Sequence, residues 1–144
     1  MTTESRVLGT WRLESLVWRV VETGEESEPY GRHPGGYIHF TADGRVFAII
    51  TSEQRSPVRS EADQIAAFAS QVAYTGRYRI EGSTFTTKVD IASDPAWSGI
   101  ELAREFSLEG DRLTITTAPF VTPKVSRGMG DKLLRAHLIW TRTV

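Results

Sequence analysis

The chain of 144 residues contains no cysteine, no long apolar run and almost no net charge. Without cysteine there can be no disulfide, no thiol nucleophile and no cysteine-ligated zinc. No apolar run approaches the roughly 18 residues of a membrane-spanning helix. The formal net charge is −1 and the 17 Lys and Arg residues are dispersed, so the sequence predicts neither nucleic acid nor a membrane as a partner.

Signals for targeting, metals and cofactors are missing as well. Met1 to Val7 lack the apolar core of a secretory signal, which predicts a cytoplasmic protein. The three histidines lie on separate segments without a spaced carboxylate pattern, so we expect no metal. We also expect no cofactor, because the chain has no phosphate loop and no dinucleotide fingerprint. The composition is that of an ordinary globular protein, and we expect one domain over residues 1–144.

Eight strand-like runs are joined by alternately short and long connections. The short links, at 41–44, 81–83 and 109–111, carry the glycines of hairpin turns. In an up-and-down meander, such hairpins gather at one end and the long loops at the other. The sequence therefore predicts an all-β fold, an eight-stranded antiparallel up-and-down barrel with a closed end and an open mouth. Its strands are expected at 9–21, 36–41, 45–51, 73–80, 84–91, 100–108, 112–117 and 133–142.

One helix is expected near residues 60–72, between the third and fourth strands. Ser60 can cap it, and Asp63 completes the pattern of a capping box. The helix would lie at the open end, with its apolar stripe against another apolar surface, as a lid or a plug. The stripe consists of Ile65, Phe68, Ala69 and Val72.

Alternation along the strands sorts side chains into two faces. In the first strand it separates Trp11, Leu13, Ser15 and Val17 from Leu16 and Trp18. In the run 84–91 it groups Phe85, Thr87, Val89 and Ile91. In the last strand it turns His137 outward, opposite Leu134, Ala136, Leu138 and Trp140.

Arg104 is the first candidate for a functional residue. It shares the apolar face of its strand with Leu102 and Phe106, which places a guanidinium inside the barrel. A buried cation needs a partner. That partner is an oxygen of a ligand, a developing oxyanion, or an internal group in a structural pair.

Further candidates are aromatic or carry imidazole. Tyr74 and Tyr78 share one face of their strand and would form a flat wall for a ligand, or fill the core. His39 lies in a strand with two partly apolar faces, so its direction is open; turned inward, it could act as acid or base. Trp97 and Phe120 lie in loops of the mouth and would grip a ligand or tuck beneath the helix.

Several short motifs resemble the bacterial lipocalin-like domain family. The start Gly9-Thr10-Trp11 looks like the G-x-W signature of lipocalins, in which an Arg near the end of the last strand packs across the Trp. Here that Arg is Arg142, and the meander places both residues at the closed end. Many members carry an imidazole near the position of Thr87, and its absence argues against acid–base chemistry from that strand. Other matching pieces are Pro29-Tyr30-Gly31, Gly36-Tyr37, Asp43-Gly44, Gly76-Arg77-Tyr78, Asp94-Pro95-Ala96-Trp97, Arg104 and Gly110-Asp111-Arg112-Leu113-Thr114.

Three functional readings follow. In the first, the barrel binds a small, largely hydrophobic molecule with an oxygen-bearing end, through Arg104, Tyr74, Tyr78, His39, Trp97 and Phe120. In the second, the cavity holds a cofactor-independent cyclase, isomerase or dehydratase for a polyketide- or terpenoid-like compound of secondary metabolism, with Arg104, Tyr78 and His39 as candidate catalytic groups. In the third, side chains fill the barrel and the protein acts through its surface. The expected partner is a small ligand, and a homodimer stays open.

Overall fold

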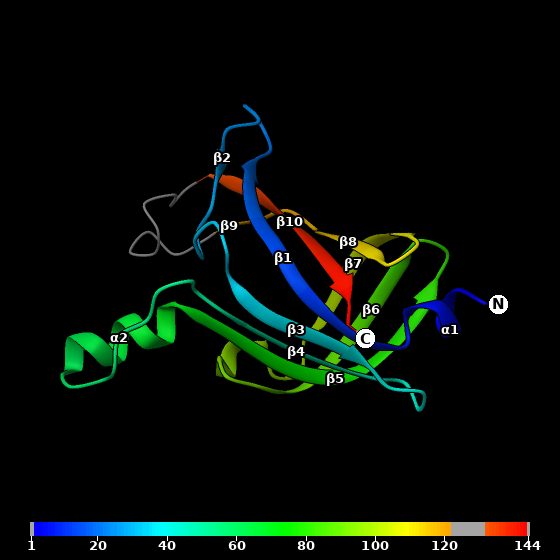
Figure 1. The fold of residues 1–144 in the computed structure, drawn as a ribbon, viewed down its shortest axis with the longest axis horizontal. Coiled ribbons are helices and arrows are strands. Elements are labelled where there is room, and N and C mark those ends of the chain that lie inside the picture. The colour runs from blue at the N-terminus through cyan, green and yellow to red at the C-terminus, as the bar shows by residue number, and fades with distance from the viewer. Residues whose placement is uncertain (1, 122–131, 144) are drawn as a thin grey trace.

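Eight antiparallel strands close into a barrel in the computed structural model, which describes residues 2–121 and 132–143 (Figure 1). Successive strands are neighbours, and the first also pairs with the last, so the barrel has no open edge. The predicted all-β architecture is confirmed. The barrel strands are β1 (Gly9–Val20), β3 (Gly35–Phe40), β4 (Arg45–Thr51), β5 (Gln71–Glu81), β6 (Thr84–Ala92), β7 (Glu101–Glu109), β8 (Arg112–Thr117) and β10 (Leu133–Arg142).

Tight hairpins join β3 to β4, β5 to β6 and β7 to β8, as predicted. Their turns contain Gly44, Gly82 and Gly110, with φ angles of 91°, 62° and 60°. Glycine adopts this left-handed conformation without the steric cost that a Cβ atom imposes. Each turn reverses the chain at the closed end, so the long connections lie at the mouth.

Four short elements outside the barrel were not predicted. They are the helix α1 (Thr3–Val7), the strands β2 (Glu26–Ser27) and β9 (Phe120–Val121), and the 3₁₀ helix η1 (Pro95–Trp97). β2 pairs with β1, and β9 pairs with β10. The expected long connection at 118–132 falls mainly on residues 122–131, which lie outside the described residues.

The predicted helix is α2 (Glu61–Ala69), between β4 and β5. The Ser60 hydroxyl accepts a hydrogen bond from the Asp63 amide at 3.1 Å, as the capping pattern predicts. The Asp63 carboxylate accepts from the Arg59 amide at 2.9 Å. At the other end, Arg55 donates to the carbonyl of Ala67 at 2.9 Å and so supplies a partner for the last turn.

The expectation that α2 packs as a lid or plug is wrong. The helix buries none of its side chains, and Figure 1 shows it extending away from the barrel. Ile65 is 73% exposed and Phe68 is 51% exposed. Of the predicted stripe, Val72 belongs to β5 and packs against the core, whereas Ile65 and Phe68 stay exposed because the connections to β4 and β5 carry the helix beyond the mouth.

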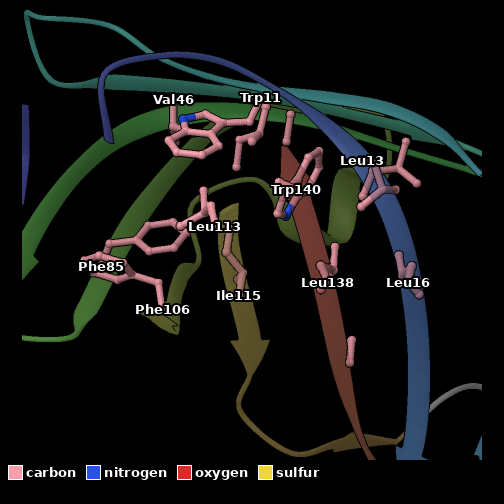
Figure 2. Packing of buried hydrophobic residues seen from close by; sticks show 14 of the residues in the cluster. Trp11, Leu13, Leu16, Val46, Phe85, Phe106, Leu113, Ile115, Leu138 and Trp140 are labelled. Carbon is pink, nitrogen blue, oxygen red and sulfur yellow. The ribbon is translucent and has the colours of Figure 1, made fainter. Parts of the chain in front are cut away.

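A close-packed core runs along the barrel, from the closed end to Val20 and Leu134 near the mouth. Near the closed end, Trp11 and Trp140 are almost fully buried beside Leu13 and Leu113 (Figure 2). Phe85 packs edge-on against both Phe40 and Phe106, with ring centroids 5.6 and 5.8 Å apart. These contacts fix the positions of the strands that also carry the partly buried interior residues.

Two β-bulges change which side chains face inward. In β1 the pairing with β10 slips between Leu13 and Ser15, so Glu14 is the additional residue. Trp11, Leu13, Leu16 and Trp18 are consequently all buried. The predicted division of this strand is therefore wrong beyond Leu13, since one inserted residue exchanges the two faces.

The second bulge lies in β6, where Thr75 of β5 pairs with Ile91 while Gly76 pairs with Val89. Val89 is buried, whereas Ile91 is 69% exposed. The prediction that Ile91 shares the inner face with Val89 is thus wrong for the same reason as in β1.

Candidate functional site

Arg104 lies on the inner face in the middle of β7. Its cross-strand partners are Phe85 of β6 and Thr117 of β8, both buried. The three glutamates of β7 lie on the opposite, exposed face. The only hydrogen bond of the Arg104 side chain to a described residue is a long one of 3.4 Å to the carbonyl of Ala103.

Tyr74 reaches the same region from β5. Its ring packs on Trp97 of η1 with centroids 5.5 Å apart and a tilt of 45°. Both rings are partly buried, and they belong to segments that meet at the mouth. The two aromatic side chains therefore form a shared apolar surface.

The electrostatics of Arg104 and Tyr74 are coupled. Burial lowers the pKa of Arg104, and the nearby Tyr74 opposes that shift. Burial raises the pKa of the Tyr74 phenol, and Arg104 opposes it. Tyr74 therefore stays protonated near neutral pH and can donate its hydroxyl hydrogen. No described carboxylate contributes to either shift, so the cation lacks an acidic partner among residues 2–121 and 132–143.

Thr87 adds a polar group that sequence reasoning did not select. It is fully buried on the inner face of β6, and its Oγ1 has no hydrogen-bond partner in the described structure. It pairs with Leu102, so it is a diagonal neighbour of Arg104 across the β6–β7 ladder. Alternation placed Thr87 inward, but only coordinates show that its hydroxyl is unpaired. The indole nitrogen of Trp140 is likewise buried without a described partner.

Tyr78 faces inward but does not join this group. Its hydroxyl lies 3.4 Å from the carbonyl of Thr41, and its ring packs edge-on against Phe40 at 5.2 Å. Burial raises the pKa of Tyr78, and the charges of Glu4 and Asp43 act in the same direction. The side chain thus points to the hairpin between β3 and β4 at the closed end.

His39 lies on the outside of the barrel, which corrects its inclusion among the cavity residues. Its neighbours Ile38 and Phe40 are buried, so alternation turns the imidazole outward. Nδ1 of His39 lies 2.7 Å from the hydroxyl of Thr10. The sequence could not place it because the outer face of β3 is itself apolar, with Tyr37 49% exposed.

An apolar groove of about 390 Å³ crosses this outer face. It runs over β3 to β6, and exposed side chains line it. The most exposed are Tyr37, Phe47, Ile49 and Ile91. A second hollow of about 260 Å³ lies among mouth loops, around Tyr30 and Glu53.

Phe120 occupies β9 rather than a free loop. Its ring packs edge-on against Trp18 with centroids 5.7 Å apart, and it contacts the core at the end of the barrel where β1 ends and β10 begins. The structure therefore packs Tyr74 on Trp97, brings Tyr74 within electrostatic range of Arg104, and makes Thr87 a diagonal neighbour of Arg104. Tyr78, His39 and Phe120 point elsewhere.

Residues 2–121 and 132–143 contain no group of three or more His, Asp or Glu side chains arranged to hold a metal ion. In the same residues, no helix has the length and apolar character needed to cross a membrane.

Comparison with known proteins agrees with this architecture. A comparison with curated proteins gives no match. Among solved structures, the chain is similar to a lipocalin-like protein from Bacteroides uniformis, with a TM-score of 0.50 and 12% sequence identity. The match covers 95% of this chain and 98% of the other, and it shows a shared fold. The model of the lipocalin-like domain family matches residues 8–143, and the chain therefore belongs to that family.

Proposed function

We propose that the protein binds a small, largely hydrophobic molecule with an oxygen-bearing end inside the barrel, near its mouth. The observation that carries this proposal is Arg104, an inward-facing cation that has no acidic partner among the described residues. A buried charge without a partner is costly, and a ligand oxygen would compensate it through a charge-assisted hydrogen bond. The lipocalin-like fold supports the same conclusion, because such barrels enclose cavities for small ligands.

The surroundings of Arg104 fit an apolar ligand body. Tyr74 and Trp97 are partly buried and pack on each other, so they offer an aromatic surface to the apolar part of a ligand. Flat aromatic walls with few polar groups are the usual lining of small-molecule sites.

A fluorescent apolar probe, 1-anilinonaphthalene-8-sulfonate, tests the proposal. We expect it to bind the native protein, and Arg104→Leu to fold normally but weaken binding by about 2 kcal/mol or more, the scale of a hydrogen bond to a charged group. Arg77→Leu is the matched control, because Arg77 is exposed on the outer face of β5. Phe47→Ser in the outer groove should leave binding intact. Loss of binding in Phe47→Ser but not in Arg104→Leu would locate the probe outside and contradict the proposal.

The alternative is an enzyme that works without a cofactor in the same cavity. Tyr74 favours it in one respect: as a neutral phenol beside a cation, it could support a developing oxyanion together with Arg104. In that case, Arg104→Leu should lower kcat by more than it raises KM. Turnover of a polyketide- or terpenoid-like compound by the purified protein would distinguish this function from binding.

A further inference from the structure

The region around Arg104 has hydrogen-bond donors but no described acidic group to receive them. The glutamates of β7 are on the exposed face, and Tyr74 is the only described group that acts on Arg104 by charge. Among residues 2–121 and 132–143, the guanidinium thus has no negative charge that would compensate it on the inner face. A neutral ligand oxygen would satisfy a donor but leave that charge in place.

Three hydrogen-bond donors stand on the inner faces of three adjacent strands. Tyr74 is on β5, Thr87 on β6 and Arg104 on β7. The Thr87 hydroxyl has no described partner, and Arg104 has only its long contact with Ala103. A guanidinium presents its N–H groups as a planar fork that fits the two oxygens of a carboxylate, which together offer about four acceptor positions. The fork and two hydroxyls match that number.

We propose that the natural ligand is an apolar carboxylic acid, whose ionised head lies between Arg104 and Tyr74 and whose flat body rests on Trp97. This inference rests on the proposed function and specifies its ligand class. Thr87 contributes a donor from the wall between the two anchoring residues.

Matched probes that differ only in charge provide the test. We would measure binding of 2-naphthoate and of 2-naphthamide by titration calorimetry at pH 7.5. The native protein should bind the carboxylate at least about tenfold more tightly, consistent with the added strength of a charged hydrogen bond. Arg104→Gln retains a donor but removes the charge, and it should reduce this preference to about twofold or less. Arg77→Gln should keep the full preference.

Each other result overturns the proposal in a distinguishable way. Equal or tighter binding of the amide would reject the anionic class while leaving the proposed function standing. A carboxylate preference that survives in Arg104→Gln would place the anion at another site. Failure of both probes to bind the folded native protein, together with failure of 1-anilinonaphthalene-8-sulfonate, would reject the ligand class and the proposed function together.

Discussion

The guanidinium carbon of Arg142 lies 4.1 Å from the centroid of the Trp11 ring, where β1 begins and β10 ends. Arg142 Nη1 also donates to the carbonyl of Leu8 at 2.7 Å, and Trp11 Nε1 donates to that of Val7 at 2.8 Å. The contact predicted from the meander and from the lipocalin-like signature is confirmed. Together with these hydrogen bonds, the contact holds Val7 and Leu8 against the closed end of the barrel.

Trp11→Ala should therefore lower the free energy of unfolding by about 3–5 kcal/mol, the usual cost of removing a large buried aromatic side chain. Trp11 is fully buried, and its loss would also remove the stacking surface of Arg142. Urea denaturation would measure the change. Trp97→Ala, at a partly buried position near the mouth, should cost clearly less; equal losses would show that the closed end is not the main support of the fold.

Gly76→Ala should destabilise the protein by about 1–3 kcal/mol or more, the cost of overpacking a filled site. A Cβ atom at Gly76 would lie 2.1 Å from the carbonyl oxygen of Lys88, next to the bulge in β6. Backbone atoms there cannot move aside as a flexible side chain can. Thermal unfolding would measure the effect, and Gly76→Ala with an unchanged melting temperature would contradict the close approach. At Gly82 a Cβ meets open space, so Gly82→Ala should cost only about 1–2 kcal/mol, from its positive φ.

Helix α2 should contribute little to global stability, because none of its side chains is buried. Ile65→Ala should change the free energy of unfolding by no more than about 0.5 kcal/mol, whereas Ile38→Ala, at a site only 2% exposed, should cost about 2–5 kcal/mol. Amide hydrogen exchange should show the helix opening well before the barrel strands. Strong protection of residues 61–69 in the free protein would mean that something covers the helix.

Stability should fall as the pH drops below about 6.5, in part because of His137. Burial lowers the pKa of His137, and the charge of Arg19 lowers it further. The unfolded chain therefore takes up the proton at a higher pH than the folded protein, and protonation favours unfolding until the folded histidine also binds a proton. His137→Gln should flatten this part of the stability profile, measured by urea denaturation between pH 7.5 and 5. Parallel profiles for the two proteins would rule out this contribution.

Strand positions, hairpins and closure could be predicted because each rests on local chemistry. Alternating apolar residues mark strands, and glycines such as Gly44 mark the turns that need positive φ. The side of the sheet on which each side chain lies could be predicted only up to the first β-bulge of a strand. The bulges at Glu14 and Asp90 each add one residue, and nothing in their side chains signals the insertion.

The candidate site could be predicted for Arg104 and Tyr74, since both stand in strand stretches where alternation holds. Their proximity could not, because it depends on how the tilted strands bring distant positions together. The prediction that His39 lines the cavity was wrong for a different reason. The outer face of β3 and β4 is apolar, with Tyr37, Phe47 and Ile49 about half exposed. Burial and hydrophobicity do not coincide on that face, so a pattern of apolar residues could not tell inside from outside.

The unpaired hydroxyl of Thr87 gives the last prediction. A buried hydroxyl without a hydrogen-bond partner lowers the free energy of unfolding by about 1–3 kcal/mol, whereas a methyl group of the same size carries no such penalty. Thr87→Val should therefore stabilise the ligand-free protein, by about 1 kcal/mol, while weakening the binding of 2-naphthoate if the hydroxyl donates to the carboxylate.

Thr117→Val is the matched control for Thr87→Val. Its hydroxyl accepts a hydrogen bond from the Ala136 amide at 2.9 Å, so its removal should destabilise the fold by leaving that amide unpaired. Melting temperatures and calorimetric affinities of both variants would decide the matter. If Thr87→Val instead destabilised the protein as Thr117→Val does, then Thr87 would have an internal partner and no role in holding a ligand.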